Sequence, residues 1–231
     1  MPSVADWDGD GFLDVMMNDI WGHVRIYRNP GRKGTLDLEK PQPIEVEWKG
    51  ANPELAWGWE KPKGKELLTQ WRTRALMYDW NKDGLMDLIV LDQEGYLAWF
   101  ERFKDASGRL LLRHPQRVFL RDGRMVPLLW SNGVVGKSGR RQFCIADWTR
   151  DGKDDFLLNG GNVQLYRQMK KTDEGWTFSM GGGFGKRKLA GHPSCPTVVD
   201  FDNDGVPEAI VGTEDGRFFH HLNPFAFKWG K

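Results

Sequence analysis

The sequence has no long apolar stretch and almost no net charge, and each absence argues against a class of protein. No run of about eighteen apolar residues occurs, so a transmembrane helix is not expected. The 33 basic and 32 acidic side chains give a formal charge of +1, which is not the basic footprint of a nucleic-acid-binding domain. No segment shows convincing helical periodicity either. The sequence therefore predicts neither a membrane span nor a nucleic-acid partner.

Cysteine is scarce, and Cys144 and Cys195 are the two in the chain. No further Cys or His lies at ligand spacing from them, which argues against a zinc site. Buried thiols are the favoured interpretation because cysteine behaves as a small apolar side chain, while a disulfide stays open. The chain also lacks the nucleophile patterns of serine and cysteine hydrolases and a Gly-rich phosphate loop.

What the sequence does contain is one nine-residue acidic loop, repeated four times. The loops span residues 6–14, 79–87, 147–155 and 200–208. Oxygen-bearing side chains fall at positions 1, 3, 5 and 9 of each loop, and glycine stands at position 6, where it permits a sharp turn. Ca²⁺ takes about six to eight oxygen ligands, and alternating acids in a tight loop can supply them. The spacing differs from the EF-hand, whose bidentate Glu stands at position 12.

Up to four calcium sites are therefore predicted, with the carbonyl of position 7 completing each set. The expected ligands are Asp6, Asp8, Asp10, Phe12 and Asp14; Asp79, Asn81, Asp83, Leu85 and Asp87; Asp147, Thr149, Asp151, Lys153 and Asp155; and Asp200, Asp202, Asp204, Val206 and Glu208. Asn81 and Thr149 each remove one negative charge, so the second and third sites are expected to be weaker.

Short apolar and aromatic runs flank every loop and read as strands. Gly22, Gly95 and Gly216 each follow the first Asp of their loop by sixteen residues, and Gly161 follows by fourteen, so the strand register repeats with the loop. The loops start 73, 68 and 53 residues apart, which fits one four-stranded unit per repeat and predicts a propeller or a solenoid.

Two further expectations concern the strands. A fourth strand is expected at 44–48 in the first unit, and at about 109–112, 176–178 and 225–229 in the others. The aromatic residues at loop position 2 are expected in the repeat core. These residues are Trp7, Trp80, Trp148 and Phe201.

The segment 5–15, followed by the strand 24–29, resembles the FG-GAP or VCBS repeat of integrin-type β-propellers, and the resemblance covers all four units. It implies an all-β fold, a β-propeller of four-stranded blades. The expected units, about 3–70, 71–138, 139–191 and 192–231, make a single propeller region over 1–231. Seven blades are common in that family, so a C-terminal part of a larger propeller is favoured over a small closed one.

In that family the calcium loops lie on one face of the disc, and ligand sites usually lie on the other. The segments that precede the innermost strands should reach that second face. They carry Arg72, Arg74, Arg140, Arg141 and His192. Arginine matches carboxylate or sulfate groups, so the implied ligand is anionic. Pairing of these arginines with local acids is the alternative.

Trp57 and Trp59 belong to a long insertion between units 1 and 2 and could stack on sugar rings. A loop packed by its own side chains is the alternative for both. The repeats and the segments 191–197 and 214–219 are similar to bacterial VCBS propellers that include uronate-polysaccharide lyases and rhamnose–glucuronate hydrolases. That similarity implies an anionic polysaccharide or oligosaccharide as partner, with His192 as the candidate catalytic base.

Three functions stay open. The chain is expected to be a polysaccharide lyase or glycoside hydrolase, a non-catalytic glycan- or protein-binding module, or a calcium-stiffened adhesion propeller. Calcium sites of millimolar affinity suit an extracellular, periplasmic or cell-surface protein. The first residues have no charged and apolar regions of a signal peptide, so the natural N-terminus is expected to be missing. The sequence does not indicate an oligomeric state.

Overall fold

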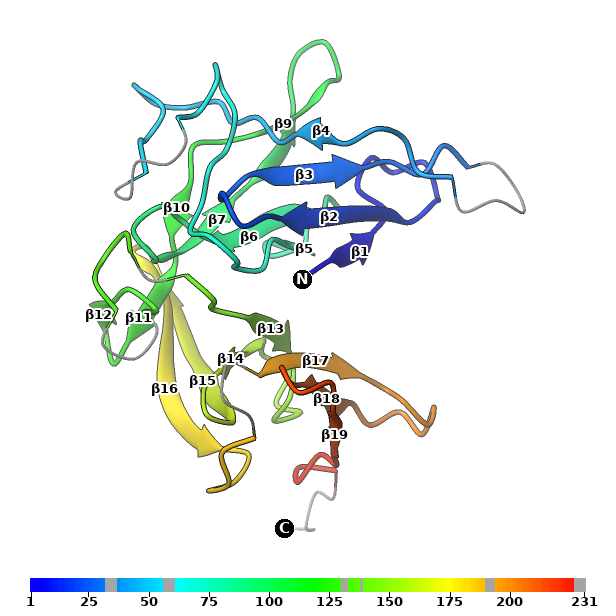
Figure 1. Ribbon diagram of the computed structural model, residues 1–231, viewed down its shortest axis with the longest axis vertical. Coiled ribbons are helices and arrows are strands. Elements are labelled where there is room, and N and C mark those ends of the chain that lie inside the picture. Colours follow the sequence, from blue (N-terminus) through cyan, green and yellow to red (C-terminus); the bar gives the residue numbers. More distant parts are fainter. Residues whose placement is uncertain (32–36, 56–60, 130–132, 138, 190–193, 227–231) are drawn as a thin grey trace. The chain divides into compact units, whose positions relative to one another are not determined.

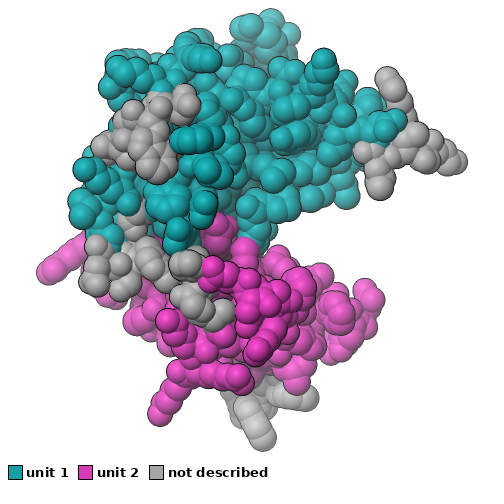
Figure 2. Space-filling model, viewed as in Figure 1, with its two compact units in different colours: residues 1–119, 126–140 teal, residues 120–125, 141–231 magenta. Residues whose placement is uncertain are grey.

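The computed structural model describes residues 1–31, 37–55, 61–129, 133–137, 139–189 and 194–226. These residues form β-strands and no helix, as the sequence predicts (Figure 1). The chain divides into two compact units (Figure 2). Unit 1 comprises residues 1–119 and 126–140, and unit 2 comprises residues 120–125 and 141–231. No described helix is long and apolar enough to cross a membrane.

Unit 1 contains two four-stranded antiparallel sheets. The first has the order β1 (Ser3–Ala5), β2 (Asp14–Asn18), β3 (Val24–Tyr27) and β4 (Gln42–Pro43). The second has the order β5 (Leu76–Tyr78), β6 (Asp87–Leu91), β7 (Leu97–Phe100) and β10 (Gln116–Arg117). In each sheet an acidic loop joins the first two strands. The loops are thus held at fixed strand ends.

The fourth strands of unit 1 differ from the expected segments. The first sheet uses 42–43 in place of 44–48, because Val46 instead bonds to the carbonyl oxygen of Lys65. The expected strand at 109–112 forms β9 (Leu110–Leu112), which pairs with β8 (Arg102–Lys104) in a separate hairpin. The chain then continues to β10, which takes the predicted place beside β7.

Unit 2 holds most of a larger sheet and one smaller sheet. The larger has the order β12 (Arg124–Met125), β11 (Phe119–Arg121), β16 (Gly175–Gly183), β15 (Val163–Thr172), β14 (Asp155–Asn159) and β13 (Phe143–Ala146). The smaller has the order β17 (Cys195–Val199), β18 (Glu208–Gly212) and β19 (Phe218–His221). The expected fourth strand at 176–178 lies within β16. At 225–229 the described residues 225–226 are not in a strand.

The aromatic residues at loop position 2 do not all lie in the core. Trp7, Trp80 and Trp148 are buried as predicted. The prediction for Phe201 is wrong, because its side chain is 65% exposed and its ring contacts only the ring of His220 among the described aromatic side chains. The ring of Trp148, by contrast, stacks on Phe184 at 4.9 Å.

The glycine that follows each second strand makes a tight turn in three units. Gly22, Gly95 and Gly216 have φ angles of +88°, +92° and +80°, in the region that favours glycine. In the first turn, the amide of Gly22 donates to the carbonyl of Asp19. These turns set the distance between the second and third strands, which explains their regular spacing in the sequence.

Candidate metal loops and basic cluster

The first Asp of each acidic loop is bonded to the backbone of its own loop. Its two carboxylate oxygens accept hydrogen bonds from the amides of positions 5 and 6. In loop 6–14 the distances from Asp6 are 3.1 Å to the Asp10 amide and 2.9 Å to the Gly11 amide. The same pair of bonds recurs around Asp79, Asp147 and Asp200. The chain is therefore wrapped around the carboxylate of position 1.

Two backbone positions in each loop are left-handed. Glycine at position 6 has φ between +83° and +90° in all four loops, which confirms the role inferred from the sequence. Position 4 is left-handed too, although it holds Gly9, Lys82, Arg150 and Asn203. Lysine and arginine rarely adopt this conformation, so the residue types at position 4 of the second and third loops did not predict it. The two turns together curl the loop inward.

The carboxylate at position 5 closes a smaller turn. Its Oδ1 accepts the amide of position 7, at 2.9 Å from Asp10 to Phe12 and at similar distances in the other loops. This bond orients the peptide unit before position 7. Within the described part of the chain, the second oxygen of Asp10 accepts no hydrogen bond, so it is available to a cation.

Position 9 is buried and joins the loop to the strands that follow. Asp14, Asp87 and Asp155 are 0% exposed, and Glu208 is 3% exposed. Asp87 accepts the amide of Trp80 at 3.1 Å and that of Arg102 at 2.7 Å. Asp14 accepts the equivalent amides, of Trp7 and Asn29. Asp155 accepts those of Thr149 and Gln168, and Glu208 accepts that of Phe201. Burial raises the pKa of Asp87, although its hydrogen bonds to the amides of Trp80 and Arg102 oppose the shift.

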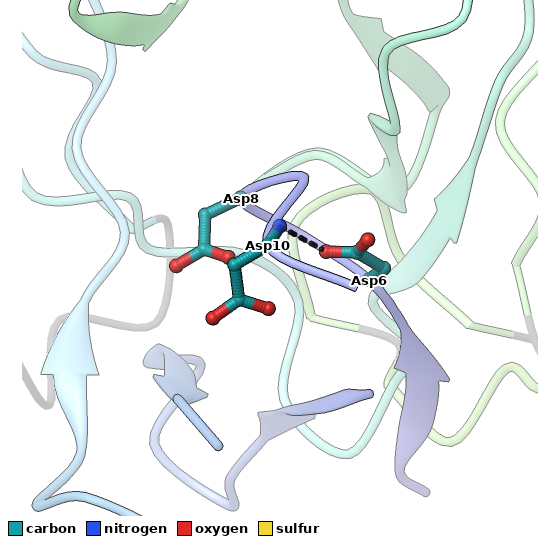
Figure 3. Close-up of side chains that lie close together, drawn as sticks. All are labelled: Asp6, Asp8 and Asp10. Atoms are coloured by element: carbon teal, nitrogen blue, oxygen red, sulfur yellow. Dashed lines mark hydrogen bonds between the residues drawn. The ribbon is translucent and has the colours of Figure 1, made fainter. Parts of the chain in front are cut away.

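Acidic oxygens group together in the first and last loops. Asp6, Asp8 and Asp10 each offer an oxygen within 4.8 Å of the others (Figure 3). Asp200, Asp202 and Glu208 do the same. This donor set contains only oxygen, which suits a hard cation such as Ca²⁺. The second and third loops carry Asn81 and Thr149 in place of an acid at position 3, and their weaker binding stays a prediction.

Negative charge is poorly compensated at Asp8. Burial raises its pKa, and the charges of Asp14 and Asp10 raise it further. Arg28 donates from Nη1 to its Oδ2 at 2.9 Å, whereas its Oδ1 is buried without a hydrogen-bond partner among the described residues. A cation would satisfy this oxygen and reduce the repulsion between the carboxylates.

Two of the predicted substrate-binding arginines meet at one tryptophan in unit 1. The guanidinium carbon of Arg72 lies 5.5 Å from the centroid of the Trp71 ring, and that of Arg140 lies 5.1 Å from it. The amide of Arg140 donates to the carbonyl of Trp71 at 3.1 Å. Gly139 permits this approach, because a Cβ there would overlap the Trp71 ring. We call Trp71, Arg72 and Arg140 the basic cluster.

The remaining candidates are placed differently. Arg74 and Arg141 are both buried, and Arg141 donates from Nη1 to the carbonyl of Asn159 at 2.5 Å. The predicted residues Trp57, Trp59 and His192 lie outside the described residues. Trp71 was not among the predicted site residues. Its position next to Arg72 and eight residues before Asp79 could have identified it from the sequence.

Comparison with known proteins gives one family match. Residues 147–211 match the model of the FG-GAP-like repeat. A search of curated proteins finds no match. Among solved structures, the chain is similar to one described as the structure of the Photorhabdus luminescens Tc holotoxin pore, at 17% identity and a TM-score of 0.44. That alignment covers 95% of this chain and 9% of the other.

The matched segment includes the third and fourth loops and reaches β18. The first and second loops share their backbone hydrogen bonds and their pair of left-handed positions. Each loop also joins the first two strands of an antiparallel sheet. Residues 147–211 therefore match FG-GAP-like repeats, and the shared loop geometry supports the same type of repeat in unit 1. The four sheets that carry an acidic loop are blades of the β-propeller type.

Proposed function

We propose that the chain is a calcium-binding FG-GAP module in which the ions stiffen the blades. The observation that carries this proposal is the close grouping of acidic oxygens in loops 6–14 and 200–208. Their backbone amides already bind the carboxylates of positions 1 and 5, so these side chains are oriented before an ion arrives. The side chains at positions 1, 3, 5 and 9 would hold Ca²⁺.

The four loops should differ in affinity. In loop 79–87, Asn81 replaces a carboxylate, and its amide donates to Asp83 at 2.9 Å. In loop 147–155, Thr149 supplies no charge. Fewer negative ligands weaken calcium binding, so we assign the tighter sites to the first and fourth loops. Sites of this kind work at extracellular calcium levels, which supports a location outside the cytoplasm.

The substitution Asp10→Asn tests calcium binding in the first loop. Asparagine keeps the acceptor for the Phe12 amide but removes a charge from the oxygen group. We expect the calcium-dependent rise in the unfolding temperature to shrink, while the unfolding temperature in chelator stays nearly unchanged. The measurement is thermal unfolding with millimolar calcium and with chelator, and Asp204→Asn is the matched variant in the fourth loop. Equal losses in both buffers would rule out the proposal for that loop.

The basic cluster favours a second function, the binding of an anionic polysaccharide or oligosaccharide. Arg72 is exposed and Arg140 is partly exposed, and each can offer a planar pair of donors to a uronate carboxylate. The Trp71 ring between them limits their movement through cation–π contact. Lyase or glycosidase chemistry would need a base, for which His192 is the candidate. The proposal for this surface is therefore binding, with catalysis as its extension.

The double substitution Arg72→Gln with Arg140→Gln tests the basic cluster. Loss of charged hydrogen bonds to a carboxylate costs about 1.5–3 kcal/mol each, so we expect affinity for a glucuronate-containing oligosaccharide to fall at least about tenfold. Calorimetric titration gives the affinity, and ultraviolet absorbance of unsaturated products reports any lyase activity. The control is Arg121→Gln, an exposed arginine on β11. Unchanged affinity in the double variant would refute glycan binding at the cluster.

A further inference from the structure

A pocket of about 560 Å³ lies in unit 1, beside the first acidic loop, whose Trp7 lines it, and apart from the basic cluster. It is also lined by the end of β3, the segment around β4, the start of β8 and the strand β9. The charged and amide side chains of the lining are Arg28, Glu39, Gln42, Glu45 and Arg102. Its volume lies within the range of small-molecule sites, about 300–1,000 Å³.

Arg102 is the unusual residue of this pocket. It is 3% exposed, and its Nη1 is buried without a hydrogen-bond partner among the described residues. Its guanidinium carbon lies 3.5 Å from the centroid of the Trp7 ring, and its backbone amide is held by Asp87. A buried charged donor without an acceptor is unfavourable. The fixed guanidinium is thus ready to accept an anionic partner.

Nearby carboxylates do not bond to Nη1 of Arg102 among the described residues. Asp8, Asp14 and Asp87 attract the charge of Arg102 through space, and Asp87 accepts only its backbone amide. Arg28 brings a second positive charge to the rim of the pocket, with a side chain that is 45% exposed and that already donates to Asp8. Arg102 is therefore the guanidinium of this pocket that still lacks an acceptor at one nitrogen.

The rest of the lining suits a ligand with hydroxyl groups. Gln42 offers an amide, and Glu39 offers carboxylate oxygens that accept hydrogen bonds from hydroxyls; both are exposed residues. The negative charges of Glu39 and Glu45, which also lines the pocket, would oppose a ligand with several anionic groups. A single carboxylate directed toward Arg102, with hydroxyls directed toward Gln42 and Glu39, matches this arrangement best.

We infer that this pocket binds a sugar acid, with its carboxylate between Arg102 and Arg28. The ligand is either a free sugar acid or a uronate residue of a glycan, and the carboxylate chemistry is common to both. This inference goes beyond the proposed function, because neither calcium nor the basic cluster takes part in the binding.

Calorimetric titration with glucuronate in chelator buffer tests the inference, with glucose as the neutral control. We expect saturable glucuronate binding to the wild type and none of glucose. The titration of variants is done in the Arg72→Gln, Arg140→Gln background, so that only the pocket is measured. Adding Arg102→Met should abolish the binding, adding Arg28→Gln should weaken it at least about fivefold, and adding Arg121→Gln, an exposed arginine on β11, should leave it unchanged. A glucuronate oligosaccharide with both ends blocked separates the sources: its binding indicates a chain, and its failure beside glucuronate binding indicates the free acid.

Several outcomes would overturn the inference. They are the absence of saturable glucuronate binding, equal binding of glucose, and full affinity in a folded Arg102→Met variant. Since Arg102 packs on Trp7, that variant could unfold, and thermal unfolding checks this. If Arg102→Met is unfolded, Arg28→Gln provides the test, because it changes only a side chain at the rim of the pocket. Unchanged glucuronate affinity in the Arg28→Gln variant would also reject the site. None of these results depends on whether the loops bind calcium.

Discussion

Asp87→Ala is expected to lower the free energy of unfolding of unit 1 by about 3 kcal/mol or more in chelator, and by at least as much in calcium. The carboxylate is fully buried and accepts the amides of Trp80 and Arg102. Alanine would leave both buried donors without an acceptor, and each unsatisfied donor costs about 1–3 kcal/mol. Denaturant unfolding of the two proteins gives the difference.

The matched control in the same loop is Asp83→Asn. Asp83 is exposed, and asparagine keeps an acceptor for the amide of Leu85. We expect little change in chelator for this variant. The comparison separates two roles of the acidic residues, because position 5 would stabilise the fold mainly through the ion, whereas position 9 would also stabilise it through its own hydrogen bonds. If Asp87→Ala lost stability only in calcium, the structural role of position 9 would be wrong.

Gly22→Ala is expected to be about as damaging, with a loss of about 3 kcal/mol or more. The φ angle of +88° costs a residue with a Cβ about 1–2 kcal/mol. The added Cβ would also overlap the carbonyl oxygen of Thr69, whose amide donates to the Gly22 carbonyl at 2.9 Å. Backbone must therefore move, and this turn would separate from the neighbouring segment.

Gly108→Ala separates the cost of a positive φ angle from the cost of the contact between an added Cβ and Thr69. Gly108 also belongs to unit 1 and has a φ angle of +84°, but nothing lies within 4 Å of the position of an added Cβ. We expect this variant to lose only about 1–2 kcal/mol. Denaturant unfolding measures both, and similar losses in the two variants would show that the contact with Thr69 contributes nothing.

The parts of the fold that sequence predicted are those determined by short-range rules. The acidic loops, the strands on either side and the turn at Gly22 depend on residues within one repeat. Pairing of the fourth strands depends on distant segments. The run at 109–112 has a strand composition that fits either a blade edge or a hairpin, and its pairing with β8 decided between them. β11 and β12 extend the larger sheet, but the sequence contains no repeated pattern that would have predicted this extension.

The residues of the candidate sites also differ in whether the sequence could predict them. Ligand positions in the loops follow from regular spacing, so they could be named from the sequence. The direction of an arginine before a strand does not follow from spacing, and the fold buries Arg74 and Arg141 while it leaves Arg72 exposed. Arg102 could not be identified, because its contact with Trp7 joins two repeats that are far apart in the sequence.

The position of Arg102 has a consequence for how the first two loops would fill. Its backbone is held by the ninth residue of loop 79–87, and its side chain covers Trp7 of loop 6–14. An ion that ordered one loop would thereby lower the ordering cost of the other, which is positive cooperativity. Unit 1 would then respond to calcium over a narrower concentration range than two independent loops would.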